Sequence, residues 1–221
     1  MSEPNNFAFE NFSFWKEKSQ IDYQSLFLFL WLALNVWMKN HFPKIENEEI
    51  EEIEEIEKTK KYSDRNRLDM LKSSGGDLYG AFSRLIIATN VDGERFRSEL
   101  GELHDALAGA RIQYNKDKWI NKTIDFNCCI IDWNNGEPLF ESILFLEEID
   151  DETPSINYIE LNDHLSVEND PERIFKAYIE IVYQIRNILI HGDSDKNIKD
   201  ITHIRVVRQL YITLSMVMED I

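Results

Sequence analysis

The hydrophobic pattern first marks a helix near the start of the chain. Leu, Phe, Trp and Ala occupy every face of the segment from Tyr23 to His41, which predicts a helix surrounded by protein. Its longest apolar run, Leu26 to Met38, is 13 residues long and contains Asn35, whereas a membrane-spanning helix needs about 20 apolar residues. Pro43 ends the pattern. We therefore expect a buried helix and no membrane partner.

Helical spacing of apolar residues returns further along the chain. After the Gly75-Gly76 break, the residues that recur at this spacing are Tyr79, Phe82, Leu85 and Ile86. A further helix is expected over Glu94 to Gln113. Near the end of the chain two more are expected, over residues 172–191 and 197–218, separated by Gly192-Asp193-Ser194.

The residue composition changes between the first predicted helices and the last two. Residues 123–132 are rich in β-branched and aromatic types, and Asn134-Asn135-Gly136 supplies turn chemistry before the apolar segment 139–146. This pattern predicts a β-hairpin. Residues 147–171 are acidic and contain Pro154 and Pro171, so we expect a surface connection there, with one short strand at most. The sequence thus predicts a single domain over 1–221, mainly α, a helical bundle with a β-hairpin inserted at 121–160.

Residues 46–57 form an acidic run in which eight Glu are interleaved with Ile50, Ile53 and Ile56. The spacing of three places the isoleucines along one narrow stripe. The expected structure is a solvated acidic helix, because charge runs are usually solvated faces. The alternative is an acidic mimic of nucleic acid or a docking site for a basic partner.

Charge changes the list of possible partners. Lys and Arg total 24 and Asp and Glu total 41 in 221 residues, so the formal charge is −17. A chain of this sign is repelled by a phosphate backbone. Cys128 and Cys129 are adjacent and form no disulfide framework, and the sequence has no Cys/His cluster at zinc spacing. We therefore expect a cytoplasmic protein with no metal and no cofactor.

The candidate chemistry lies in the helix over residues 172–191. Arg186 falls inside an apolar stripe, where a guanidinium is costly unless it is paired or reaches a cavity. Asn187 follows it, and His191 with Gly192 closes the helix. Because five residues correspond to about 140° beyond a full turn, Arg186 and His191 do not stack on one face. They could converge if the helix end is distorted, or if two copies meet about a two-fold axis.

Spacing alone does not single out this pair, because Arg97 and His104 are similarly spaced. That second pair has Ser98 after the Arg, lies among acidic residues and ends within a helix. What distinguishes Arg186 and His191 is the combination of an apolar stripe, a neighbouring amide and a His-Gly helix end.

The segment from Tyr183 to Asp193, Y-Q-I-R-N-I-L-I-H-G-D, resembles the signature of HEPN domains, the higher eukaryote and prokaryote nucleotide-binding superfamily. That signature is an Arg, a polar residue and then a His. The resemblance implies a helical bundle of HEPN type and a metal-independent endoribonuclease with Arg186, Asn187 and His191 at the catalytic positions. Histidine handles protons near neutral pH, and a guanidinium stabilises charge on phosphoryl oxygens.

Further expectations follow from the resemblance. Attack by the 2′-hydroxyl of RNA leaves a 2′,3′-cyclic phosphate, and DNA is not cut. The substrate is tRNA or mRNA, and the enzyme is a toxin or antiphage defence effector. It is expected to act as a homodimer with a composite active site, beside a nucleotidyltransferase-type antitoxin or another regulatory partner.

Two alternatives remain open at the level of sequence. Arg186 could pair with a buried carboxylate while His191 caps the helix end, which is a purely structural role. A catalytically inactive HEPN module could instead bind RNA or a protein partner. From Glu172 to Tyr211 there are seven Lys and Arg against five acids, a balance of +2, so the rest of the chain carries −19. Only the region of the motif is therefore suited to receive a phosphate backbone.

Overall fold

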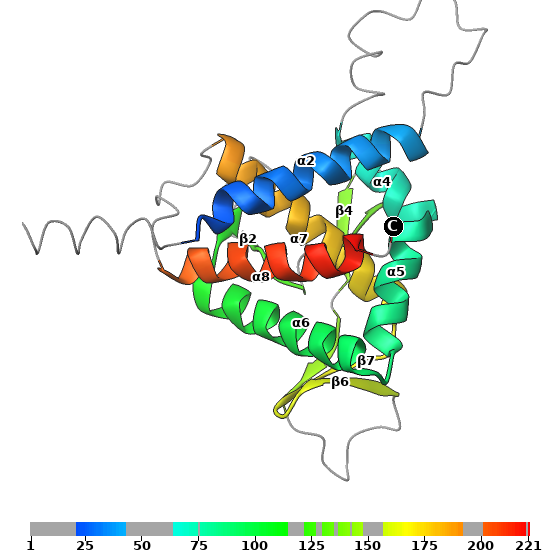
Figure 1. Cartoon of the computed structure of the whole chain (residues 1–221), viewed down its shortest axis with the longest axis vertical. Helices are drawn as coiled ribbons and strands as arrows, with labels where there is room; N and C mark the ends of the chain where they lie inside the picture. Colours follow the sequence, from blue (N-terminus) through cyan, green and yellow to red (C-terminus); the bar gives the residue numbers. More distant parts are fainter. Residues whose placement is uncertain are drawn as a thin grey trace, which may run out of the picture.

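Six α-helices make up most of the described chain, which is therefore mainly α (Figure 1). The computed structural model describes residues 21–42, 64–74, 76–114, 122–126, 130–134, 137–141, 143–147, 157–191, 201–219 and 221. The helices are α2 (Tyr23–His41), α4 (Asp64–Ser74), α5 (Gly76–Ile87), α6 (Val91–Ala110), α7 (Pro171–His191) and α8 (Ile201–Met218).

The helices pack as a bundle around α8. This helix contacts α2 on one side and α6 on the other, and α7 passes behind α2 and α8 in the view of Figure 1. At one end of the bundle, α5 contacts α6, α7 and α8, while α4 contacts α2 and α7. The buried ring of Phe82 joins three of these elements, with centroids 5.3 Å from Phe96 and 5.4 Å from both Phe175 and Tyr178.

The bounds predicted for α2 are confirmed, but its predicted burial is wrong. Asp22 caps the first turn by accepting a hydrogen bond from Ser25 N at 3.1 Å. Phe27, Trp31, Leu34 and Met38 are buried on the inner side of α2, where α7 and α8 lie. Its outer side is exposed, because the described elements pack against one side only.

Two other helices differ from the sequence-based expectation. The helix predicted over Glu94 to Gln113 is α6, which starts earlier because Asn90 accepts a hydrogen bond from Gly93 N at 2.9 Å. It ends earlier because Arg111 is left-handed, with φ 47°. Helix α4 was not predicted, because its sequence is polar apart from Leu68, Met70 and Leu71.

The strands are short and antiparallel. They are β1 (Gln113–Tyr114) with β2 (Lys122–Thr123), β3 (Ile130–Asn134) with β4 (Glu137–Glu141), and a sheet of order β5-β7-β6 (Phe145–Leu146, Leu165–Glu168, Tyr158–Asn162). The pairing of β3 with β4, Asn134 opposite Glu137, is the predicted hairpin, although it begins at residue 130 and ends at 141. The chain therefore has strand structure from 113 to 168, beyond the predicted 121–160 insertion.

The expectation for residues 147–171 is wrong, since β6 and β7 both lie there. Ile159, Leu161, Leu165 and Val167 alternate along these strands and are buried, and β6 contacts α6 (Figure 1). Exposed Glu160 supplies part of the acidic character that suggested a surface connection. In a strand with one buried face, exposed acidic residues alternate with buried apolar residues, so its sequence resembles that of an acidic surface connection.

Several sequence features lie outside the described residues. They are the first twenty residues, the Glu/Ile run of 46–57, Cys128 and Cys129, the two central turn residues Asn135 and Gly136, and the 192–200 connection. Among the helices that the structure describes, none has the length and apolar character to cross a bilayer.

Candidate functional site

Helix α7 carries the candidate motif in its last turns. The helix begins at Pro171, and the side chain of Asp170 accepts a hydrogen bond from Arg173 N at 3.1 Å. Ile174, Tyr178, Ile181, Ile185 and Ile188 are buried, which fixes the rotation of α7 in the bundle. Arg186 and Asn187 follow on neighbouring faces of the helix, and His191 is the last helical residue. The side chain of His191 lies outside the described part of the chain.

Arg186 is held by two neighbours. Its Nη1 donates a hydrogen bond to Asn187 Oδ1 at 2.8 Å, and its guanidinium carbon lies 5.3 Å from the ring centroid of Trp31 on α2. Trp31 and Asn187 are buried, whereas Arg186 is half-buried. The two described members of the predicted catalytic set are therefore in direct contact, with the guanidinium fixed against an aromatic ring.

A second pattern on α7 was missed in the sequence. Glu180, Gln184, Asn187 and His191 follow one another at steps of four, three and four, which places them within about 60° of one helix face. Glu180, Gln184 and Asn187 are buried. The spacing was visible from the residues alone, so a search for polar as well as apolar stripes would have found it. The stripe leads from a buried carboxylate to the last residue of the motif.

Glu180 is the centre of an ionic cluster that joins α4 to α7. Its carboxylate accepts hydrogen bonds from Arg65 Nη1 at 2.6 Å, from Gln184 Nε2 at 2.5 Å and from Lys72 Nζ. Burial raises the pKa of Glu180, but the charges of Lys72 and Arg65 outweigh it, so the pKa lies below the ordinary value. Burial likewise lowers the pKa of Arg65, and the Glu180 charge more than restores it. Glu180 and Arg65 therefore stay charged near neutral pH.

Two aromatic rings connect this cluster to the motif. The guanidinium carbon of Arg65 lies 5.5 Å from the ring of Tyr183, whose centroid is 6.0 Å from that of Trp31. Trp31 in turn lies against Arg186. The two arginines thus bracket a pair of rings contributed by α7 and α2. This arrangement fixes Arg186 through packing with three helices.

Two buried polar atoms near the motif have no hydrogen-bond partner among the described residues. Trp31 Nε1 is a donor and Gln184 Oε1 an acceptor. Trp31 touches Arg186 directly, and Gln184 stands one turn before Asn187 on the polar stripe. Both atoms are enclosed by protein, so a molecule on the surface does not reach them.

The pair Arg97 and His104 has a structural role. Arg97 Nη1 donates to the carbonyl oxygens of Ile86, at 3.3 Å, and of Ala88, at the end of α5. The ring of His104 stacks on Phe145 at 4.4 Å. Arg97 therefore caps one helix while His104 packs against the sheet, and spacing alone would have misassigned both residues.

The remaining histidines divide into two kinds. His41 stacks on Trp37 at 4.0 Å and lies 3.4 Å from Asp77, while exposed His164 lies 3.2 Å from Asp105. Both contacts are those of ordinary exposed side chains. His203, by contrast, is buried on α8. Within the part of the chain that the structure describes, no group of His, Cys, Asp and Glu is arranged to hold a metal ion.

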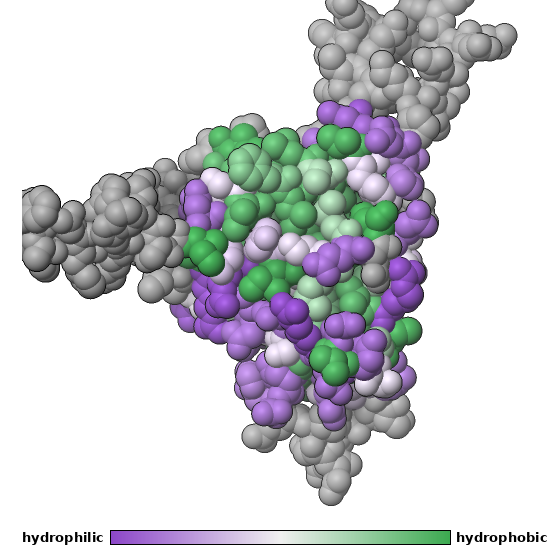
Figure 2. All heavy atoms as spheres, viewed as in Figure 1, coloured by the Kyte–Doolittle hydropathy of each residue, from purple (hydrophilic) through white to green (hydrophobic). Residues whose placement is uncertain are grey.

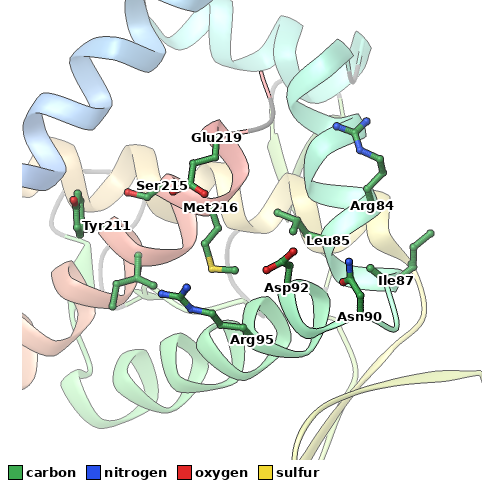
Figure 3. A pocket seen from close by; sticks show the side chains of 12 residues that line it. Arg84, Leu85, Ile87, Asn90, Asp92, Arg95, Tyr211, Ser215, Met216 and Glu219 are labelled. Carbon is green, nitrogen blue, oxygen red and sulfur yellow. The ribbon is translucent and has the colours of Figure 1, made fainter.

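A separate hollow of about 770 Å³ lies between α5, α6 and α8 (Figure 3). Asp92 and Arg95 project into it from α6, and Met216 and Glu219 come from α8. A second hollow of about 670 Å³ borders β6 and β7, and four of its eleven lining residues are acidic. Neither contains a residue of the motif, so neither bears on the candidate chemistry of α7.

Comparisons with known proteins give no assignment, since no family model, curated protein or solved structure matches this chain. The functional reading therefore rests on the residues and contacts of the chain itself.

Proposed function

We propose that this chain is a metal-independent endoribonuclease of HEPN type in which Arg186, Asn187 and His191 form the active site. The observation that carries the proposal is the 2.8 Å hydrogen bond between Arg186 and Asn187 at the end of α7, with the guanidinium against Trp31. This contact fixes the guanidinium of Arg186 beside the amide of Asn187, and His191 follows four residues after Asn187. Such a fixed cation is what a phosphoryl group requires.

The proposed reaction is a transesterification within RNA. The 2′-hydroxyl loses its proton to a base and attacks the adjacent phosphorus, and the bond from phosphorus to the 5′-oxygen breaks. The departing oxygen takes up a proton, so the products are a 2′,3′-cyclic phosphate and a 5′-hydroxyl. His191 serves in proton transfer, and Arg186 stabilises the charge on the phosphoryl oxygens. Asn187 orients Arg186 through their hydrogen bond.

The surroundings of Arg186 support a site for a polar, anionic substrate. The region from Glu172 to Tyr211 has a balance of +2 in a chain of −17. An RNA backbone would therefore be repelled by most of the molecule and attracted near the motif.

The biological role that follows from this chemistry is that of a toxin or antiphage defence effector acting on tRNA or mRNA. Free ribonuclease activity damages the cell that makes it, so such an enzyme needs an inhibitor or an activating signal. A nucleotidyltransferase-type antitoxin is the proposed regulatory partner.

The test is cleavage of tRNA and mRNA by the purified protein with EDTA present. Arg186→Ala and His191→Ala should each lower the cleavage rate by at least about a hundredfold, the usual cost of losing a charge-stabilising or proton-transferring group. Arg95→Ala and His164→Ala are matched controls, because both side chains are exposed and lie outside the motif and outside the region from Glu172 to Tyr211. Products should carry a cyclic phosphate, and 2′-O-methylated RNA should resist. Equal cutting by wild type and both motif variants would overturn the proposal.

The alternative is a non-catalytic module of the same fold that binds RNA or a protein. The observation that favours it is that the described contacts of half-buried Arg186 are made within the chain, to Asn187 and Trp31. This alternative predicts no cleavage under any condition and a complex that survives both motif substitutions.

A further inference from the structure

The outer face of α2 is apolar and exposed. Phe29, Leu32 and Val36 are 66%, 55% and 58% exposed, and Ala33 lies among them. Their positions follow the spacing of a helix stripe that normally faces a protein core. Figure 2 shows apolar surface extending along α2 on this side of the molecule. Contiguous apolar patches on a protein surface usually mark a contact with another molecule.

Charge indicates which molecule fits this face. No charged residue occurs from Gln24 to Met38, and the neighbouring helices α2 and α8 together carry Lys39, Arg205 and Arg208 but no carboxylate. A basic partner would therefore find no acidic group on these helices, although the chain as a whole carries −17. Two copies of the chain repel one another over their acidic surfaces. They can approach through α2, where that repulsion is weakest.

The stripe is also complementary to itself. When two α2 helices lie antiparallel with a two-fold axis between Leu32 and Ala33, Leu32 of each copy faces Ala33 of the other. Phe29 of each copy then faces Val36 of the other, so a larger side chain meets a smaller one at every position. We propose that a second copy of this chain docks on this face and forms an antiparallel α2–α2 dimer.

The dimer has a consequence for the motif that rests on the proposed ribonuclease function, whereas the α2 contact itself does not. Trp31, on the inner side of the same helix, lies between the outer face and Arg186. The two paired helices therefore separate the Arg186 side chains of the two copies. The dimer carries two separate active sites in place of the shared cleft expected from the sequence, so Arg186 and His191 of one chain converge through distortion of the end of α7, the other route open from the sequence.

Oligomeric state tests the contact without any activity. Sedimentation velocity over a concentration series should show a dimer for the wild type. Leu32→Glu should raise the dissociation constant at least about a hundredfold, because an unpaired carboxylate would be buried at the axis. Val91→Glu is the matched control, since Val91 is 77% exposed and lies in the first turn of α6. A monomeric wild type, or a dimer that Leu32→Glu leaves intact, would overturn the proposal, with an unchanged far-UV circular dichroism spectrum confirming that the variant is folded.

The antiparallel register has its own test. Phe29→Glu and Val36→Lys should each weaken the dimer, and the double variant should recover it at low salt through two ion pairs between the copies. In a parallel pair, Glu at 29 would meet Glu at 29 and recovery would fail. Failure of recovery therefore contradicts the antiparallel register.

Mixed dimers test the separate sites. A mixture of Arg186→Ala and His191→Ala chains should remain inactive, because each site lacks one group of its own chain, whereas a composite cleft would regain about a quarter to a half of the wild-type activity by random pairing. Recovered activity would overturn the separate-site arrangement. If the wild type cuts no RNA, the proposed function fails, while sedimentation still decides the α2 contact.

Discussion

A buried hydroxyl pair joins the two C-terminal helices at the level of single residues. Thr213 on α8 donates to the carbonyl oxygen of Gln209 at 2.8 Å, which leaves its oxygen to accept from the hydroxyl of Tyr178 on α7 at 3.0 Å. Burial raises the pKa of Tyr178, and the hydrogen bond to Thr213 offsets only part of that rise. The phenol is therefore neutral over the whole ordinary pH range.

Tyr178→Phe should lower the free energy of unfolding by about 1 kcal/mol at pH 7, because the ring is kept while one buried hydrogen bond is lost. Since the folded-state pKa is raised, the contribution of Tyr178 is present below pH 10 and declines as the pH rises further. Denaturant unfolding at pH 7 and above pH 10 should therefore show the difference from wild type shrinking. Tyr211→Phe, at a half-buried ring on α8, is the control, and a constant difference would contradict the assignment.

At the level of elements, one carboxylate determines how α4 sits on α7. Glu180 is buried, and its partners Arg65 and Lys72 lie seven residues apart on one face of α4. Half-exposed Asp69 on α4 also lies 3.3 Å from Arg65 and 3.7 Å from Lys72, so removing Glu180 takes away the buried counter-charge of both cations and leaves them only this exposed carboxylate. The same cluster reaches the motif through Tyr183 and Trp31.

Glu180→Gln should destabilise the fold by about 3–5 kcal/mol at pH 7, the usual cost of breaking a buried ion pair. Because the folded pKa of Glu180 is lowered, its contribution is present above its ordinary value of 4.5 and is lost as the pH falls through the folded value. Unfolding curves between pH 7 and pH 3 should show the variant and wild type converging. Glu172→Gln breaks an exposed pair with Lys176 on the same helix and should cost under about 1 kcal/mol. Equal losses of stability in the two variants would contradict the role of Glu180 in holding α4 on α7.

The sequence predicted the features of the fold that depend on residues close together in the chain, and it missed features that depend on contacts between distant residues. Local periodicity was enough for α2, α7 and α8. It did not predict the hydrogen bond between Arg186 and Asn187, although these residues are adjacent in the chain. It was not enough for α4, whose position depends on Glu180, 115 residues after Arg65. The spacing of the polar stripe on α7 is visible in the sequence. Its structural role could be recognised only when the structure showed which residues pair with Glu180. The exposure of the outer face of α2 could not be predicted without knowing which helices cover its inner face.

At the level of the whole molecule, the charge of −17 opposes both proposed associations in different ways. It disfavours a second copy of the chain, although the contact face itself is uncharged. It also disfavours RNA everywhere except near the motif. Salt screens both effects, but RNA binding additionally depends on direct contacts between phosphates and cations.

Opposite salt dependences are therefore expected. Raising NaCl from about 50 to 300 mM shortens the Debye length from about 14 to about 6 Å, which should tighten the α2 dimer severalfold and weaken RNA binding. Sedimentation and fluorescence anisotropy with labelled RNA measure the two. Leu32→Glu should stay monomeric at both concentrations. A dimer that weakens with salt would indicate ionic contacts and contradict an uncharged interface.

The position of α2 in the chain has a consequence for biosynthesis. Its inner face is covered by α7 and α8, whose residues are translated more than a hundred positions later. Until those residues leave the ribosome, this apolar helix lacks its contacts with α7 and α8, and α4 is the earlier helix that it contacts. Long sequence separation of this kind delays productive folding and exposes nascent chains to aggregation. Helix α2 is thus a segment of the nascent chain that exposes apolar surface until the last two helices have been made.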